Sequence, residues 1–249
     1  MLHNRLDKIK NYIAERQYAS IRELHELCPD VTLMTLHRDL DALARDGLLY
    51  KVRGGVRMLK TSGEPSFQIR ESENTGPKTI IAEKAINLIN EGGSVFFDAG
   101  TTSLAVVRAL PDLNLTVITT GANFANELQR FTNMTVYMCC GALNRANMAL
   151  SGHSTLGFLD GVNIDLGFIG VSGFSMESGF TCGKESEMQV KKLVIQKARK
   201  SVALMDSAKL SRLMPYTFAY LDDVDYVICD EALPDEFMRA AKKSRVTIL

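Results

Sequence analysis

Hydrophobic residues between positions 6 and 43 recur three and four residues apart, a spacing that places them on one face of an α-helix. Three segments show this spacing, and their apolar residues are Leu6, Ile9 and Ile13, then Ile21, Leu24 and Leu27, then Leu36, Leu40 and Leu43. Ser20 and Glu23 have the spacing of a capping box, and Thr32 is the expected N-cap of the third helix. Two short strands are expected around Gly54 and Gly55. Three helices followed by a glycine-centred hairpin predict a winged helix-turn-helix.

The polar face of the third predicted helix carries side chains suited to DNA. A turn of about 100° per residue places Met34, Thr35 and Arg38 opposite the leucine stripe, with His37 beside them. In a helix-turn-helix the N-terminal part of this face enters the major groove. There Arg38 can bind guanine through two hydrogen bonds, and Thr35 can offer a methyl group to thymine or a hydroxyl to a base edge.

The predicted hairpin adds four basic residues with no acid between them, Lys51, Arg53, Arg57 and Lys60, which suits contact with phosphates. The residues expected to contact double-stranded operator DNA are Ser20, Thr32, Met34, Thr35, His37, Arg38, Lys51, Arg53, Gly54 and Arg57. On this pattern alone, a small helical domain with a solvated basic face is the alternative.

The second part of the chain alternates short apolar runs with amphipathic segments. Expected strands span 94–97, 115–120, 135–141, 164–173, 201–206, 225–231 and 246–249, and expected helices span 78–92, 102–110, 122–131, 186–200 and 234–243. This alternation predicts an α/β domain with a mainly parallel sheet. The segment 60–77 is polar and rich in Gly, Pro, Ser and Glu, as a linker is. We therefore expect a DNA-binding domain at 1–59, a linker at 60–77 and an α/β domain at 78–249.

Glycines and hydroxyl residues cluster where the predicted strands end, which is where α/β sheets bind ligands. In the stretch 98–103, Gly100 lets the backbone approach a ligand, and Thr101, Thr102 and Ser103 offer hydroxyls. The N–H groups that begin the next helix favour an anion such as a phosphate. The alternative is an ordinary strand-to-helix turn with a threonine cap. Similar clusters lie at 119–123, 140–144, 170–181 and 206–209.

Composition and charge narrow the class of protein. The 249 residues are 46% hydrophobic and 23% charged, as in ordinary globular proteins. The first 60 residues carry 11 Lys and Arg against 8 Asp and Glu, and the remainder carries 18 against 21, so the basic part is the candidate for a polyanion. Five cysteines fit neither a disulfide framework nor a zinc site, and no apolar run reaches the roughly 18 residues of a spanning helix. We expect a cytoplasmic protein with no membrane association, metal or cofactor.

The stretch 31–56, VTLMTLHRDLDALARDGLLYKVRGGV, resembles the signature of the DeoR family of bacterial transcriptional regulators. Its matching residues are Val31, Met34, Thr35, Arg38, Asp39, Leu40, Leu43, Gly47, Leu49, Gly54 and Gly55. It departs from the signature at Thr32, Leu33, Leu36, His37 and Arg53. Because Leu33 and His37 lie at the end that faces the groove, the operator sequence of a relative does not carry over.

The strand-end clusters also resemble this family, whose C-terminal domain is similar to ribose-5-phosphate isomerase and senses phosphorylated sugars. The family pattern D-x-G-T-T, for example, matches Asp98, Gly100, Thr101 and Thr102, while Thr120 replaces a family asparagine. The resemblance implies a sugar-phosphate site formed by Asp98, Gly100, Thr101, Thr102, Ser103, Thr119, Thr120, Gly141, Gly170, Gly173, Thr181, Glu187, Lys191 and Lys209.

Catalytic residues of the isomerases are missing from the corresponding segments. Those enzymes place paired aspartates in a D-G-A-D-E loop, whereas 170–179 contains no aspartate and has Glu177 as its only acid. Isomerisation needs a carboxylate base, so we expect binding without turnover and assign no catalytic residue. The alternative is a sugar-phosphate isomerase with an appended helical module, in which Asp98, Glu185 or Glu187 would supply the acid or base. The preferred interpretation is a repressor of carbohydrate-metabolism genes that a sugar phosphate releases from DNA, acting as a homo-oligomer (dimer or tetramer) on paired half-sites.

Overall fold

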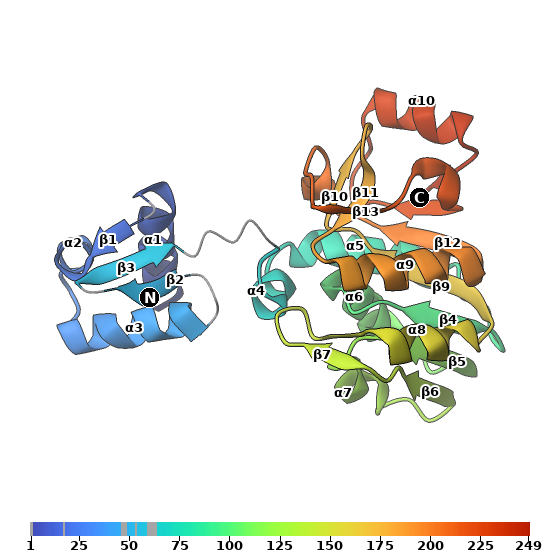
Figure 1. Ribbon diagram of the computed structural model, residues 1–249, viewed down its shortest axis with the longest axis horizontal. Coiled ribbons are helices and arrows are strands. Elements are labelled where there is room, and N and C mark those ends of the chain that lie inside the picture. The colour runs from blue at the N-terminus through green and yellow to red at the C-terminus, as the bar shows by residue number, and fades with distance from the viewer. Residues whose placement is uncertain (1, 17, 46–48, 53, 59–63) are drawn as a thin grey trace. The chain divides into compact units, whose positions relative to one another are not determined.

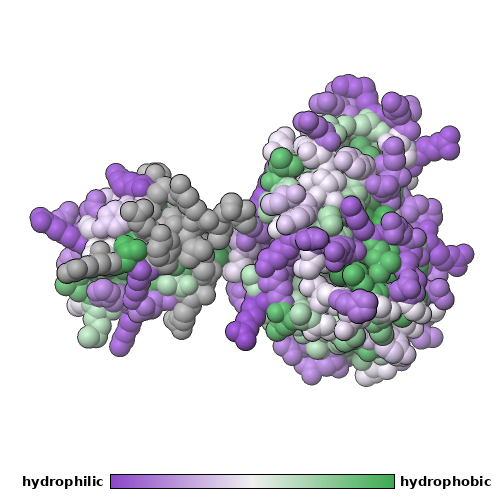
Figure 2. All heavy atoms as spheres, viewed as in Figure 1, coloured by the Kyte–Doolittle hydropathy of each residue, from purple (hydrophilic) through white to green (hydrophobic). Residues whose placement is uncertain are grey.

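The computed structural model describes residues 2–16, 18–45, 49–52, 54–58 and 64–249 (Figure 1). The chain divides into two compact units, Met1–Ile69 and Arg70–Leu249. Each unit has its own hydrophobic core. Hydrophilic side chains project around the rims of both units in Figure 2, as expected of globular surfaces. None of the helices in the described ranges is long and apolar enough to span a bilayer.

The N-terminal unit is a winged helix-turn-helix, which confirms the predicted fold. Its elements are α1 (Leu2–Arg16), β1 (Tyr18–Ser20), α2 (Ile21–Leu27), α3 (Leu33–Arg45), β2 (Leu49–Val52) and β3 (Gly55–Met58). The strands form an antiparallel sheet in the order β1-β3-β2. Strand β1 was not expected, because three residues are too few to show a period. It reaches β3 closely, and a side chain at Gly55 would collide with the carbonyl of Ala19.

The leucine stripes meet in the core of this unit. Ile9 and Ile13 of α1, Leu24 of α2, and Leu36 and Leu40 of α3 have no exposed surface. The predicted capping box is present at the start of α2, where the Glu23 N–H donates to the Ser20 hydroxyl at 3.2 Å and the Ser20 N–H donates to the Glu23 carboxylate at 2.7 Å. The capping box therefore fixes where α2 begins, and the leucine stripe determines which face of α3 is exposed to solvent.

A partly buried ion pair joins α1 to α3. Arg5 donates to the two carboxylate oxygens of Asp39 at 2.7 and 3.2 Å, and Asp39 is 7% exposed. Asp39 is the acid that directly follows Arg38 in the family signature. Its role is to hold the helices together, while Arg38 points to the exposed side.

The C-terminal unit is an α/β domain built on a seven-stranded parallel sheet, which confirms the predicted fold class. Strand order is β15-β14-β12-β9-β4-β5-β6. The strands are β4 (Ser94–Phe97), β5 (Leu115–Thr119), β6 (Met134–Met138), β9 (Ile164–Gly170), β12 (Ala198–Leu204), β14 (Tyr226–Ile228) and β15 (Thr247–Ile248). The helices are α5 (Thr75–Ile86), α6 (Thr101–Ala109), α7 (Phe124–Leu128), α8 (His153–Asp160), α9 (Glu185–Lys197) and α10 (Asp235–Lys243).

Helices cover both faces of this sheet (Figure 1). Helices α5 and α6 pack together, and α8 packs against α9. The crossovers from β4 towards β6 and from β9 towards β14 run in opposite directions along the sheet, so right-handed connections place α6 and α9 on opposite faces. Inside, the rings of Phe97 and Phe168 stack across β4 and β9 with centroids 5.3 Å apart.

Several elements were not predicted. A short helix, α4 (Phe67–Ser72), lies in the segment expected to be a linker. Two small antiparallel sheets also appear, β7 (Ala142–Asn144) with β8 (Ala149–Ser151), and β10 (Gly173–Ser175) with β11 (Gly179–Cys182) and β13 (Tyr216–Ala219). The helix predicted at 186–200 ends at Lys197, because Arg199 and Lys200 already belong to the exposed start of β12.

Candidate functional site

The strand order of the large sheet reverses between β4 and β9. Strands β5 and β6 continue on one side of this point, and β12, β14 and β15 continue on the other. Open α/β sheets bind ligands at such a switch point, outside the carboxyl ends of the strands. Asp98 directly follows β4, and Gly170 ends β9. The Gly170 N–H donates to Asp98 Oδ2 at 2.8 Å, so these two positions join across the switch point.

Asp98 accepts four hydrogen bonds from the protein itself. Oδ1 accepts from the Gly100 N–H at 3.0 Å and from the Ser103 hydroxyl, while Oδ2 accepts from the Gly170 N–H and from Lys191 Nζ at 2.5 Å. A carboxylate has about four lone-pair positions, so all of them are used. Lys191 also donates to the Gly170 carbonyl at 2.7 Å. The cluster therefore fixes the loop after β4 to the end of β9 and to α9.

Both charges of the Asp98–Lys191 pair are retained despite burial. Asp98 is 4% exposed and Lys191 is 7% exposed. Burial acts to raise the pKa of Asp98, but the charge of Lys191 and the donated hydrogen bonds outweigh it, so this pKa lies below its ordinary value. Burial acts to lower the pKa of Lys191, and the Asp98 carboxylate more than reverses that effect. A carboxylate held in this state is a poor proton acceptor.

The loop that follows Asp98 leads into α6 with free donors. Gly100 is the N-cap, and helix α6 begins at Thr101. The first N–H groups of a helix have no partner within the helix. Neither the Thr101 nor the Thr102 hydroxyl has a hydrogen-bond partner among the described residues. The start of α6 thus offers backbone and hydroxyl donors beside a saturated carboxylate.

At the ends of β5 and β6, the polar groups of the predicted residues mainly hold the backbone in place. The Thr119 hydroxyl accepts from the Gly121 N–H at 3.0 Å, and the Thr120 carbonyl accepts from the Leu150 N–H at 2.8 Å. Gly141 has a φ of 139°, and a side chain there would collide with the Thr155 hydroxyl. These contacts bring the β7–β8 hairpin to the same edge of the sheet.

Asn147 is a further residue of the candidate site, and the sequence did not reveal it. Its amide nitrogen donates to the Glu187 carboxylate at the start of α9, and its amide oxygen accepts from the Ala149 N–H at 3.3 Å. Asn147 is only 9% exposed. No motif marks it, since its partner Glu187 lies 40 residues further along the chain.

Two predicted residues lie in the small antiparallel sheet instead of offering free groups to the edge. The Thr181 hydroxyl donates to the Gly173 carbonyl at 2.9 Å and accepts from the Met214 N–H at 3.1 Å. A side chain at Gly173 would collide with the carbonyl of Arg212. Direct ligand contact was predicted for both and remains a prediction. In the structure the Thr181 hydroxyl is engaged within the protein, as are Asp98 and Ser103.

A second polar cluster lies beside the end of β12. Lys209 Nζ is 3.6 Å from Asp206 Oδ2, while Asp206 Oδ1 is buried without a hydrogen-bond partner. Lys78 of α5 donates to the carbonyl of Arg70, which lies within α4, and to the carbonyl of Glu73, which directly follows α4. Burial lowers the pKa of Lys78 to about 8, with Asp206 opposing the shift and Lys209 adding to it. Lys78 was not predicted, because it appeared as one polar position of an amphipathic helix.

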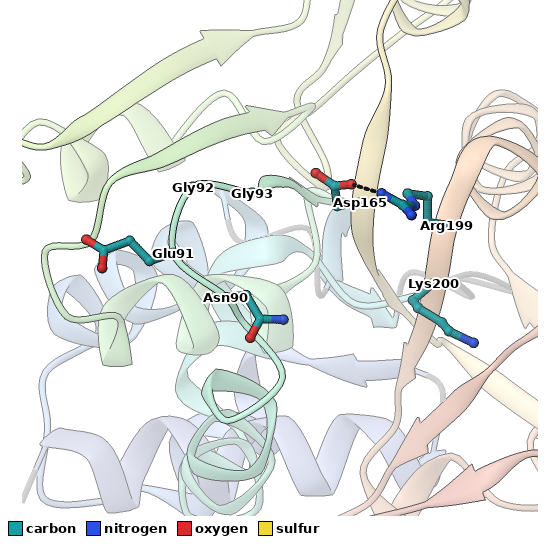
Figure 3. A pocket seen from close by; sticks show the side chains of 7 residues that line it. All are labelled: Asn90, Glu91, Gly92, Gly93, Asp165, Arg199 and Lys200. Carbon is teal, nitrogen blue, oxygen red and sulfur yellow. Dashed lines mark hydrogen bonds and ion pairs between the residues drawn. The ribbon is translucent and has the colours of Figure 1, made fainter.

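A surface depression of about 590 Å³ lies at the opposite edge of the sheet, where β4, β9 and β12 begin (Figure 3). Its lining residues are Asn90, Glu91, Gly92, Gly93, Asp165, Arg199 and Lys200. Arg199 lies 3.4 Å from Asp165, and Lys200 lies 2.7 Å from Asp225. Because its basic residues are paired with carboxylates and it is remote from the switch point, we assign it no part in the candidate site. Among the described residues, no three His, Cys, Asp or Glu side chains gather as metal ligands would.

The predicted DNA-contacting residues of α3 lie on its exposed side. Met34 is 69% exposed, and His37 and Arg38 are exposed as well. Arg38 has no hydrogen bond or ion pair within the described part of the chain. Thr32 accepts from the Thr35 N–H at 3.3 Å, and the two threonine hydroxyls lie 3.0 Å apart.

The other predicted DNA contacts are only partly described. Ser20 uses its hydroxyl in the capping box, and Lys51 pairs with Asp41 on the surface. Gly54 takes a φ of 82°, which suits glycine at the turn between β2 and β3. Arg53 lies outside the described residues, as does the side chain of Arg57.

Comparisons with known proteins identify both units. Residues 5–62 match the DeoR-like helix-turn-helix domain, and residues 73–231 match the DeoR C-terminal sensor domain. An HTH-type transcriptional regulator of Haemophilus influenzae is 32% identical over 227 residues, covering 90% of this chain and 88% of its own. The HTH-type transcriptional regulator GlpR of Haloferax volcanii is 34% identical over 217 residues, covering 86% and 85%. The solved ribose 5-phosphate isomerase A of Methanocaldococcus jannaschii is similar over 55% of each chain, with 19% identity and a TM-score of 0.40. Because the sensor-domain match spans more than half of the chain and the relatives align over most of both sequences, the chain belongs to the DeoR family of transcriptional regulators.

Proposed function

We propose that this regulator is a repressor that releases its operator when a phosphorylated sugar binds at the carboxyl edge of the seven-stranded sheet. One observation carries the proposal. At the switch point, Asp98 is saturated by protein donors, while the donors at the adjacent start of α6 have no partner among the described residues. Such a site can hold an anion but has no base available for chemistry at Asp98.

The phosphate is assigned to the start of α6. Helix N-termini stabilise anions through their free N–H groups and the helix dipole. The N–H groups and hydroxyls of Thr101 and Thr102 supply donors. A side chain at Gly100 would crowd the Asp98 carboxylate, with its Cβ 3.0 Å from Oδ1. Asp98, Ser103 and Lys191 hold this loop in place through their own hydrogen bonds.

The sugar is assigned to the neighbouring strand ends. Thr120 directly follows β5, Gly141 lies between β6 and β7, and Glu187 lies in the first turn of α9. Lys209 ends the short 3-10 helix Ser207–Lys209 that comes after β12. A repressor of a regulon named for a phosphorylated carbohydrate compound is among the relatives, since the glycerol-3-phosphate regulon repressor of Escherichia coli is 28% identical over 228 residues, covering 91% of this chain and 90% of its own. This supports a phosphorylated effector from carbohydrate metabolism.

Binding without turnover is favoured over isomerisation. The segment Gly170–Gly179 carries no aspartate, and its acid, Glu177, is exposed in the turn between β10 and β11. The buried Asp98 has no free lone pair for a substrate proton. DNA binding is assigned to α3 and the β2–β3 hairpin of a homo-oligomer on paired half-sites, because the described part of the chain holds one reading helix of this kind.

Two measurements test this function together. The full chain is used to select duplexes from random DNA, and is separately heated with ribose 5-phosphate, glycerol 3-phosphate and inorganic phosphate. We expect selection of a two-part sequence and a raised melting temperature with a sugar phosphate, without conversion of that compound. Turnover of a sugar phosphate would instead favour the isomerase, and failure to select any sequence would contradict the DNA-binding assignment.

A further inference from the structure

Two large apolar side chains stand exposed where α3 begins. Leu33 is 51% exposed and Met34 is 69% exposed, more than any other large hydrophobic residue described in the N-terminal unit. Hydrophobic surface is visible along the α3 side of this unit in Figure 2. Leu33 and Met34 occupy the first two positions of α3, ahead of the buried Leu36. The core therefore does not use them.

The polar groups beside these two residues are already engaged. The Thr32 hydroxyl accepts from the Thr35 N–H, and the Thr32 and Thr35 hydroxyls bond to each other at 3.0 Å. A threonine hydroxyl has one proton to donate, so this pairing leaves at most one hydroxyl donor for a base edge. The first turn thus presents mainly carbon atoms. Arg38 follows about one turn later and has no ion pair among the described residues.

Duplex DNA fits this combination of carbon and positive charge. Arg38 can bind guanine or a phosphate, and the start of the helix is the part that reaches base edges. In the major groove, thymine alone among the four bases presents a methyl group. Any other base edge placed against Leu33 or Met34 would have its donors or acceptors covered without a hydrogen bond, which costs free energy.

We propose that Leu33 and Met34 are specificity-determining residues that select thymine by contact with its 5-methyl group. This inference rests on the DNA-binding function proposed above. Arg38 then reads the neighbouring position. Leu33 stands where the family signature has a glutamate, so this regulator differs from the signature in its preferred bases.

Replacing thymine by uracil tests the proposal, because it removes the methyl group and changes nothing else on the base edge. The probe is the duplex selected by the full chain from random DNA, with each thymine of a half-site replaced in turn. Burial of one methyl group is worth about 0.8 kcal/mol, so we expect the dissociation constant to rise about fourfold at one or two positions of each half-site. Leu33→Ala and Met34→Ala should each lose the penalty at one of these positions.

Leu213→Ala is the matched control, since Leu213 is a leucine of the C-terminal unit that is 64% exposed. This variant should keep every uracil penalty of the wild type. Leu33→Ala and Met34→Ala should melt at the wild-type temperature, because neither side chain is buried. Equal affinity of the wild type for thymine and uracil duplexes would overturn this inference while leaving DNA binding intact. Failure of the wild type to select any duplex would instead overturn the proposed function.

Discussion

On α3, Arg38 is exposed and has no polar partner within the described residues, whereas at the sheet edge the buried Lys191 donates to both Asp98 and Gly170. The first arrangement keeps a charged group free for a second molecule. The second uses its charges to fix a loop, and leaves the ligand only the donors that the pair does not consume. Substitutions on α3 should therefore change DNA binding without changing stability, while substitutions of the buried pair should first change stability.

The largest expected effect follows from breaking the buried pair. Lys191→Met leaves the Asp98 carboxylate buried without its cation, and removing one partner of a buried pair typically costs about 3–5 kcal/mol. We expect the urea midpoint of the C-terminal unit to fall accordingly. Lys192→Met, at the next and exposed position of α9, is the control and should unfold like the wild type. Equal stability of the two variants would show that the pair does not support the fold.

The next effect concerns effector binding at the start of α6. Thr102→Asp places a carboxylate where the phosphate is proposed to lie and removes a hydroxyl donor. We expect at least about tenfold weaker binding of the sugar phosphate, or roughly 1.4 kcal/mol, in a thermal-shift titration. Thr102→Ser keeps the hydroxyl and should bind almost normally. If Thr102→Asp binds as tightly as Thr102→Ser, the phosphate lies elsewhere.

A comparable or smaller effect is expected on the reading surface. Arg38→Ala should weaken the selected operator by about 1–3 kcal/mol per half-site and relax the preference at one base pair, with the melting temperature unchanged. Lys51→Ala should instead weaken all duplexes similarly and reduce the salt dependence, as loss of a phosphate contact does. Competition binding between the operator and unrelated DNA separates the two. An Arg38→Ala variant with unchanged specificity would place another residue in the groove.

The last effect, small over any narrow pH interval, is a dependence of stability on alkaline pH. The pKa of Lys78 is lowered from 10.5 to about 8 in the folded chain. Between these values the unfolded chain binds more protons, so this lysine makes the free energy of unfolding rise with pH, by at most about 1.4 kcal/mol per pH unit. The difference between wild type and Lys78→Met, measured by urea unfolding from pH 7.5 to 10, should show this rise. A constant difference would mean that Lys78 titrates normally.

The sequence predicted those helices and strands whose pattern of polar and apolar residues can be recognised within the element itself. The Ser20–Glu23 capping box lies within four residues, and the leucine stripe of α3 repeats within one helix. The four residues of β4 form a short apolar run between polar turns. Helix α4 and strand β1 could not be recognised, because they are too short for a period and their stability depends on packing.

Contacts within the candidate site were harder to predict than its location. The strand-end motif indicated the loop after Asp98, but the partner Lys191 lies 93 residues away and meets it only through the order of the strands. The same holds for Asn147 with Glu187. Sequence motifs therefore identified polar residues near the site, but not whether their polar groups would remain free for a ligand.

The central claim is that a sugar phosphate at the start of α6 releases DNA held by α3. It is tested most directly by titrating the sugar phosphate found in the thermal screen into a complex of the full chain with fluorescent operator, for the wild type and for Thr102→Asp. The coupling between the two sites is expected to be about 1–3 kcal/mol, which is a 5- to 150-fold loss of operator affinity. We predict that both proteins bind the operator equally without effector and that only the wild type is released. Release of both proteins at the same effector concentration would contradict the account.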